Sequence, residues 1–569
     1  MAQNDSFSRR SFLSRTIVPA AAVVGMGFGP LDQPAHAATA RETTNNLGGR
    51  VYNIRDYGAK GDGTTLDTVA LQATIDACHR DGGGTVLVPA GEFQIGTVEL
   101  RSDITLHIAA AGKLLGTSDG KKYHAVDAIP LSVAASLDDG NWALIFAVNA
   151  KNVTIEGPGT IDGQGAQFRS PGPGLPPPSG LDGDKRPYHL LFYRCQDLTV
   201  RNISLLESAY HSTRVIQSKR VHMDNIYIYN RVTVNNDGFH FISAEYVTIS
   251  NCTVQSLDDA CALFGSCKYV TITNCSFSTR WSVFRFGAGV AENIAVSNCL
   301  LYQVYGCPIK FEGNPGTRYE NMSFSNLVLQ DVTGPILISI GPRTDATGTI
   351  EGSSTDNVTP AIVRNISFSN IHGTVTTNPP IPPFPGLHST DKYNPGEAYS
   401  CISLNSVGSS ILENISFDNV HLTFGGGGTA EQGARRNLPE IVGEYFALGT
   451  MPAYGLYARN VRGLTLQNVR LNVQTPDLRP AVILDHVEDV AINGFSAEGN
   501  AEAESLLRFS DTRNALLSAC RVLGSASVFL QVEGTGSEDI LIDGGDLHKA
   551  ASPLSFQRGA TEKSVRIRT

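Results

Sequence analysis

Three aspartates are spaced so that they could act together on one bond. Asp237 precedes Gly238, and the pair Asp258-Asp259 follows roughly one sequence repeat later, embedded in apolar, strand-like segments. Neighbouring carboxylates repel each other, which raises the pKa of at least one and lets it hold a proton near neutral pH. Glycosidic hydrolysis needs one protonated acid and one ionised base. Asp237, Asp258 and Asp259 are therefore the predicted catalytic residues.

Two other interpretations of these aspartates stay open. Three carboxylates could bind calcium, as a polysaccharide lyase or uronate epimerase would require, with Lys310 or Arg285 as its base. Asn236-Asp237-Gly238 is also an ordinary turn sequence. The second acidic pair one repeat later favours catalysis over a plain turn. For a hydrolase we expect no metal and no cofactor.

A repeated pattern indicates how these residues are positioned. An apolar-x-apolar-x-Asn motif recurs with period-2 alternation, and its first six asparagines lie 23, 26, 23, 24 and 28 residues apart. A period in the twenties is typical of a stacked solenoid, in which each strand buries its apolar side against its neighbours. Asparagine suits the turn because it tolerates left-handed backbone angles and its amides can hydrogen-bond along the stack. The repeated asparagines are Asn202, Asn225, Asn251, Asn274, Asn298, Asn326, Asn370, Asn419 and Asn468.

We therefore predict an all-β fold, a single right-handed parallel β-helix over residues 50–569. The later steps of 44 to 49 residues indicate either two coils each or one coil plus an insertion. Asp67-Thr68, followed by Leu71, Ile75 and Cys78 and ended by Gly82-Gly83-Gly84, predicts a short capping helix at the N-terminal end. Three segments rich in Pro or Gly interrupt the repeat and are predicted to wall a groove: residues 163–187, 374–399 and 424–459.

Measured from the repeated asparagines, several polar residues fall at similar offsets. His211 and Asp237 both lie 14 residues before their asparagine, and Asp259 lies 15 before its own. Coils are about 5 Å apart, so these side chains are expected on one side of adjacent coils. The candidate substrate-binding residues are His211, Arg285 and Lys310 of this row, together with His240 and Trp281 nearby in the sequence.

The N-terminus and the composition bear on location and partners. Arg9-Arg10, a modest apolar run and Ala35-His36-Ala37 predict a twin-arginine export signal over residues 1–37, hence a secreted or periplasmic protein. The net charge of −10 argues against a nucleic-acid partner, and no membrane association is expected. The predicted partner is a polysaccharide or oligosaccharide substrate; the sequence leaves the oligomeric state undetermined. Cys252, Cys275 and Cys299 recur near the repeat spacing, which favours stacked core thiols over disulfides.

The chain resembles glycoside hydrolase family 28, the polygalacturonases and rhamnogalacturonases of the pectin-degrading β-helix superfamily. The resemblance lies in residues 52–63 (YNIRDYGAKGDG), residues 159–165 (GTIDGQG), residues 235–238 (NNDG) and Asp258-Asp259. It implies an inverting mechanism with Asp258 as general acid and with Asp237 and Asp259 activating water.

Two positions depart from that family's pattern. Residues 280–287 (RWSVFRFG) stand where the family has Gly-His-Gly, and Pro308-Ile309-Lys310 replaces its Arg-Ile-Lys, which grips the sugar carboxylate. Because a lone lysine cannot supply the two aligned hydrogen bonds of arginine, the sugar is left open. His240, His211 or Arg285 could replace the missing histidine in tuning the acid. A glycan-binding relative without catalysis is a further alternative.

Overall fold

The computed structural model describes residues 49–129, 141–170, 175–181, 185–287, 289–342, 359–380 and 395–568. These residues belong to one compact unit, Leu47–Thr569. The predicted export signal, residues 1–37, lies outside the described residues. Within them, no helix has both the length and the apolar character needed to cross a bilayer.

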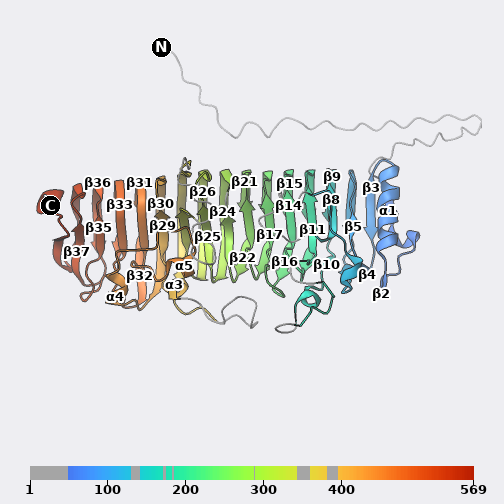
Figure 1. Cartoon of the computed structure of the whole chain (residues 1–569), viewed down its shortest axis with the longest axis horizontal. Helices are drawn as coiled ribbons and strands as arrows, with labels where there is room; N and C mark the ends of the chain where they lie inside the picture. The colour runs from blue at the N-terminus through green and yellow to red at the C-terminus, as the bar shows by residue number, and fades with distance from the viewer. Residues whose placement is uncertain are drawn as a thin grey trace, which may run out of the picture. The chain divides into compact units, whose positions relative to one another are not determined.

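The described unit is a solenoid of parallel strands. Each full coil contributes three strands, and every strand pairs in parallel with its counterpart one coil earlier and one coil later, so three faces run along the unit (Figure 1). The predicted parallel β-helix architecture is therefore present.

The strands of each face follow one another coil by coil. Face 1 contains β1 (Val51–Asn53), β3 (Gly84–Val88), β6 (Ile104–Ile108), β9 (Lys151–Glu156), β12 (Gln196–Arg201), β15 (Lys219–Asp224), β18 (Glu245–Ser250), β21 (Cys267–Thr273), β24 (Val290–Val304), β26 (Arg318–Val332), β28 (Ile362–Val375), β30 (Ile411–Gly426), β36 (Arg513–Val522), β38 (Glu538–Asp546) and β40 (Val565–Arg568). Face 2 contains β2 (Asp62–Leu66), β4 (Gly91–Ile95), β7 (Gly112–Gly116), β10 (Thr160–Asp162), β13 (Ser204–Leu206), β16 (Tyr227–Asn230), β19 (Thr253–Ser256), β22 (Ser276–Thr279), β32 (Arg470–Thr475) and β34 (Ser496–Ala497), with the ends of β24, β26, β28 and β30. Face 3 contains β5 (Val98–Glu99), β8 (Ala143–Val148), β11 (Tyr188–Tyr193), β14 (Thr213–Ile216), β17 (Phe239–Ile242), β20 (Cys261–Phe264), β23 (Ser282–Phe286), β25 (Cys307–Gly313), β27 (Ile336–Ile340), β29 (Ile402–Ser406), β31 (Leu456–Gln467), β33 (Val482–Asn493), β35 (Leu507–Ser510), β37 (Ala526–Glu533) and β39 (Ala550–Gln557). The second halves of β31 and β33 continue into face 1.

The core is made of aligned apolar positions. The pairing places one buried apolar residue per coil in a single row, and each member packs on the next at the strand spacing of about 4.8 Å. Aromatic rings stack in the same way, as in Phe324–Phe368 and Phe368–Phe417, with centroids 5.3 and 5.0 Å apart. All ten cysteines are buried and unpaired, which agrees with the predicted core thiols.

The repeated asparagines occupy the turn between face 1 and face 2. All nine have positive φ, between 48° and 58°. Several of their amides form a ladder: Asn370 Nδ2 donates to Asn326 Oδ1 at 3.0 Å, and Asn419 Nδ2 donates to Asn370 Oδ1 at 2.8 Å. The prediction of left-handed turns joined by amide hydrogen bonds is confirmed.

The long steps of the repeat are each one coil plus an insertion. Ser325 pairs with Ser369, and Ser369 pairs with Asp418, so Asn326, Asn370 and Asn419 lie on directly adjacent coils. The extra residues leave the solenoid and return. They include the short helices α3 (Pro395–Ala398), α4 (Ala430–Gly433) and α5 (Tyr445–Leu448).

A longer helix, α1 (Thr68–Arg80), lies beside β3 at the first coils (Figure 1). Leu71, Ile75 and Cys78 face inward and are fully buried, as their spacing predicts. The expected side-chain cap is absent: Asp67 accepts hydrogen bonds from the backbone N–H groups of Lys60 and Gly61 instead. The carboxylate therefore fixes the preceding loop rather than the helix end. The described residues also contain four 3-10 segments: η1 (Ile54–Tyr57), η2 (Gly120–Lys122), η3 (Gly165–Phe168) and η4 (Glu562–Ser564).

The asparagine ladder generates a stability prediction at Asn370, whose φ is 52°. Replacement by glycine removes its amide hydrogen bonds but keeps the left-handed turn, so the free energy of unfolding should fall by about 1 kcal/mol. Replacement by alanine adds a left-handed strain of about 1–2 kcal/mol. Urea and thermal unfolding should therefore rank wild type above Asn370→Gly above Asn370→Ala. Equal destabilisation in the two variants would show that the backbone angle is not the constraint.

Candidate active site

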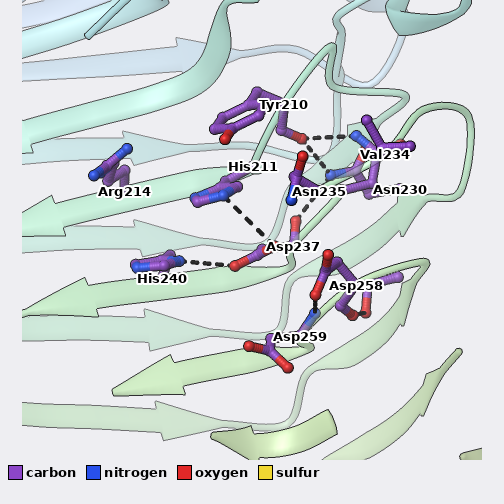
Figure 2. A network of polar contacts seen from close by, with 12 residues as sticks. Tyr210, His211, Arg214, Asn230, Val234, Asn235, Asp237, His240, Asp258 and Asp259 are labelled. Atoms are coloured by element: carbon purple, nitrogen blue, oxygen red, sulfur yellow. Dashed lines mark hydrogen bonds and ion pairs between the residues drawn. The ribbon is translucent and has the colours of Figure 1, made fainter. Parts of the chain in front are cut away.

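The three aspartates lie on the turn that joins face 2 to face 3. Asp237 stands between β16 and β17, and Asp258 and Asp259 stand between β19 and β20 on the next coil. The turns are in register, since Gly238 N–H donates to the Asp259 carbonyl at 2.9 Å. Figure 2 shows the three side chains grouped outside the strand ends rather than in the apolar core. Asp237 and Asp259 are buried, whereas Asp258 is partly exposed.

Two asparagines hold the Asp237 turn. Asn236 Oδ1 accepts from the N–H groups of Val232 and Thr233, and its Nδ2 donates to the Tyr210 carbonyl of the previous coil at 2.8 Å. Asn230 Nδ2 donates to the Asp237 carbonyl, also at 2.8 Å. Both amides are fully buried. The turn residues therefore fix the backbone and leave the Asp237 carboxylate outside this network.

Two histidines contact Asp237. His240 Nδ1 lies 2.7 Å from Asp237 Oδ2, and His211 Nε2 lies 3.5 Å from Asp237 Oδ1 (Figure 2). The imidazoles are part of a column of rings: Tyr210, His211, His240 and Phe264 stack with centroid separations of 4.5, 4.5 and 5.1 Å. Burial lowers the pKa of both histidines well below the usual value, which favours their neutral forms. A neutral His240 that carries its proton on Nδ1 donates it to Asp237 Oδ2.

The pKa values of the three aspartates are raised, which favours their protonated forms. Burial raises the pKa of Asp237 well above its usual range, and the charges of Asp258 and Asp259 raise it further. Burial also raises the pKa of Asp258. The pKa of Asp259 is raised to about 6, chiefly by burial, with Lys310 opposing the shift and Asp258 adding to it. The group as a whole therefore holds at least one proton near neutral pH.

A metal fits this geometry poorly. Among the described residues, His211, Asp237 and His240 have ligand atoms within 4.8 Å of one another, while the three aspartates together do not meet that distance. A bound ion lies close to the plane of each imidazole that ligates it. The rings of His211 and His240 are stacked face to face with only 11° between their planes, so one ion cannot lie in both planes. The calcium interpretation of the aspartates likewise lacks a compact oxygen cage.

The other predicted residues lie on the next coils of face 3. His240, Arg285 and Lys310 occupy one row of the pairing register. Arg285 Nε is 4.0 Å from Asp259 Oδ2, but its guanidinium pairs more closely with Glu312 at 2.6 Å. Lys310 Nζ lies 2.8 Å from Glu444 Oε1 and 5.0 Å from the Trp281 ring centre. The histidines thus adjoin Asp237, and the cations adjoin Asp259; neither set directly contacts Asp258 by an ion pair.

Arg459 lies away from the three aspartates and anchors an insertion. Its guanidinium donates to Asn405 Oδ1 and to the carbonyls of Leu438 and Pro439, so it anchors the 424–459 insertion. It also lines a separate cavity of about 1020 Å³ over β31–β37, together with Arg435, Arg508 and Asp485. None of the three aspartates lines that cavity.

Sequence reasoning missed the glutamate partners. Glu312 lies two residues after Lys310 on the same strand and was predictable from the strand alternation. Glu444 comes from α5, 134 residues after Lys310, and nothing in the local sequence links the two. The buried Arg186, whose guanidinium lies 4.1 Å from the Tyr210 ring centre, was also missed.

Comparison with known proteins identifies the family. The family model described as "Glycosyl hydrolases family 28" matches residues 78–382, more than half of the chain. An exo-poly-alpha-D-galacturonosidase of Dickeya chrysanthemi is 24% identical over 442 residues, 67% of this chain and 72% of that protein. An alginate lyase of Azotobacter vinelandii, "Alginate lyase 7", is 36% identical over 118 residues, but these are 20% of this chain and 14% of that protein.

Solved structures with a similar fold include a member of the same family. A family 28 exopolygalacturonase of Yersinia enterocolitica superposes with a TM-score of 0.54 at 18% identity, and the match covers 78% of each chain. At that identity the superposition shows the fold alone. The family-model match, which spans the coils that carry the three aspartates, shows that this chain belongs to glycosyl hydrolases family 28 and is a polygalacturonase-like glycoside hydrolase.

Proposed function

We propose that this protein is an exported hydrolase that cleaves a glycosidic bond of a plant or microbial polysaccharide, or of its oligosaccharides, with inversion at the anomeric carbon. Asp258 is the general acid, and Asp237 and Asp259 activate the attacking water. The observation that carries the proposal is the grouping of three carboxylates with raised pKa on two adjacent turns. Such a group supplies both the acid and the base that hydrolysis requires.

The assignment of roles rests on exposure and on the family resemblance. Asp258 is partly exposed and can reach the leaving oxygen of a bound sugar, whereas Asp237 and Asp259 are buried behind it. Burial raises the pKa of both Asp237 and Asp258, so the group holds a proton that Asp258 can donate. His240 Nδ1 lies 2.7 Å from Asp237 Oδ2, and a proton on Nδ1 stabilises the ionised form of Asp237 that acts as a base.

A lyase or epimerase on the same fold is the weaker alternative. Its support is the local match to an alginate lyase over one fifth of the chain. It requires a calcium ion and a base such as Lys310 or Arg285. Both cations already form close ion pairs with glutamates, which holds Lys310 protonated and unsuited to act as a base.

Export through a twin-arginine signal is supported by the cysteines. Ten buried, unpaired thiols suit a chain that folds in a reducing compartment before it crosses the membrane. Replacing Arg9 and Arg10 by lysine should leave the enzyme in the cytoplasm of the producing cell, as fractionation would measure. Continued export of that variant would contradict the proposal.

Two features of the fold are also proposals. The right hand of the coils follows from the strong general preference of parallel crossovers. The role of α1 as an N-terminal cap follows from its position beside the first coils, where it covers strand edges that would otherwise be open.

The catalytic assignment predicts the effect of removing each carboxylate. Asp258→Asn, Asp237→Asn and Asp259→Asn should each lower kcat by about 10²–10⁴-fold, the usual contribution of acid–base catalysis. Oligosaccharide binding should survive in Asp258→Asn. Asp418→Asn, an exposed aspartate on face 1, is the matched control and should keep full activity. NMR of fresh product should show the inverted anomer.

Other outcomes of that experiment separate the alternatives. Unchanged turnover in Asp258→Asn would remove its role as acid. Sugar binding without turnover in the wild type would indicate a non-catalytic relative. Loss of activity with a calcium chelator, together with an unsaturated product, would establish the lyase.

The pKa of Asp259 predicts the acid side of the pH profile. As a base, Asp259 works only when ionised, and its pKa is about 6. kcat/KM should therefore fall as the pH drops below about 6, and it should also fall at high pH as Asp258 loses its proton. Steady-state rates across this range would measure both limbs. A rate that rises steadily from pH 6 to pH 4 would contradict the role of Asp259.

A further inference from the structure

Three cations on the coils that follow the aspartates each face a glutamate. Arg280 lies 3.4 Å from Glu397, Arg285 lies 2.6 Å from Glu312, and Lys310 lies 2.8 Å from Glu444. These three pairs are distributed over the coils that begin with β23 and β25. A charged sugar placed beside Asp259 would therefore meet cations whose charge is already balanced.

Lys310 is the most buried of the three cations. The Lys310 side chain is 1% exposed. Burial alone would lower the pKa of Lys310, but the charge of Glu444 outweighs that effect and the pKa is raised. For Glu444, burial raises the pKa to about 7 against the opposing effect of Lys310. Above that pH the two side chains form a buried ion pair, and removing either partner leaves an uncompensated charge.

Glu444 is held in this position by the 424–459 insertion. It precedes α5, and its carbonyl accepts from the N–H groups of Ala447 and Leu448. The next residue, Tyr445, is buried in an apolar cluster with Cys307, Leu337 and Cys401. Its hydroxyl donates to the Ile336 carbonyl at 3.0 Å. The glutamate is therefore anchored to face 3 and does not lie on a free loop end.

Beside the ion pair lies an aromatic surface. Phe446 on α5 is 47% exposed, and its ring centre is 6.1 Å from that of Trp281, the residue that precedes β23. Aromatic rings at a sugar site pack against the C–H face of the pyranose ring, which is an apolar contact and needs no charge on the sugar. The ion pair disfavours a sugar carboxylate at this place, and the aromatic surface offers an apolar contact that an uncharged sugar can make.

We propose that Glu444 is a specificity-determining residue, because it pairs with Lys310, the cation that would otherwise bind a sugar carboxylate. The sugar next to Asp259 on the Lys310 side is therefore neutral, and it packs on Trp281 and Phe446. This inference rests on the proposed hydrolase function and narrows its substrate class. A uronate in that subsite would bring its carboxylate close to Glu444, Glu312 and the aspartates, and like charges juxtaposed at an interface are strongly disfavoured. Polysaccharides that contain neutral residues, or oligosaccharides ending in one, are the corresponding substrates.

The test compares two substrates of identical linkage in wild type and Glu444→Gln. The substrates are oligogalacturonates and the same oligomers after chemical reduction of their carboxyl groups, assayed at about pH 7.5 so that Glu444 is ionised. Wild type should prefer the reduced oligomers in kcat/KM. Glu444→Gln keeps an oxygen for Lys310 but removes the charge, so the ratio of acidic to neutral kcat/KM should rise about tenfold or more.

Control variants separate specificity from folding and from catalysis. Glu440→Gln makes the same charge change four residues away, at an exposed site of the same insertion, and should leave the ratio unchanged. Phe446→Ala should raise KM for the neutral oligomers with little change in kcat. Should Glu444→Gln fold poorly, the wild-type preference and the Phe446→Ala result still decide the question.

The outcomes distinguish the proposed role of Glu444 from the proposed hydrolase function on which it rests. Equal or better cleavage of the acidic oligomers by wild type, or an unchanged ratio in a folded Glu444→Gln, overturns the role of Glu444 while the hydrolase stands. Cleavage that survives Asp258→Asn overturns the proposed catalytic mechanism itself.

Discussion

The in-register stacking of parallel coils is the constraint on which the rest of the structure depends. Each strand hydrogen-bonds only to its counterparts one coil away, so a residue at a given position of the repeat lies directly over its equivalent at a spacing of about 4.8 Å. The asparagine ladder fixes this register at the turn between face 1 and face 2. A slip of one residue would turn every core side chain outward. The same register that aligns the core also aligns the turns that carry Asp237 and Asp259.

Stacked turns bring the negative charges of the aspartates close together, and nearby cations balance them. Adjacent coils cannot be separated further, so aspartates on successive turns must share protons or be balanced by cations. The charges of Arg214 and Arg186 lower the pKa of Asp237 against the effect of burial, and those of Lys310 and Arg285 do the same for Asp259. Lys310 and Arg285 would themselves be costly if left unpaired, and Glu444 and Glu312 pair with them. The electrostatic network therefore alternates in sign outward from the aspartates.

The sequence predicted what depends on the repeat and missed what depends on the insertions. Period and alternation gave the parallel solenoid, the positive φ of the asparagines and the shared row of His240, Arg285 and Lys310, since each follows from local spacing. The sequence could not decide whether the steps between Asn326, Asn370 and Asn419 are two coils each or one coil plus an insertion, because a coil and an insertion have similar lengths. Glu444 was not predictable, since its contact with Lys310 spans 134 residues and depends on how α5 packs. The histidines were expected to tune Asp258, whereas the column of rings directs both towards Asp237.

Residues on the coils are held more firmly than residues on the insertions, and this difference bears on function. Residues on the coils are fixed by two neighbouring coils at once, so the carboxylates that need accurate placement lie there. The 424–459 insertion is tied to face 3 through a few anchors, chiefly Tyr445 and Arg459, and its side chains can change without altering the register of any strand. A charge delivered from the insertion, as Glu444 is, can therefore alter which sugar is accepted while the catalytic turns stay unchanged. The departure from the family's pattern at Trp281 is consistent with this arrangement, because Trp281, like Lys310, faces the insertion rather than the core.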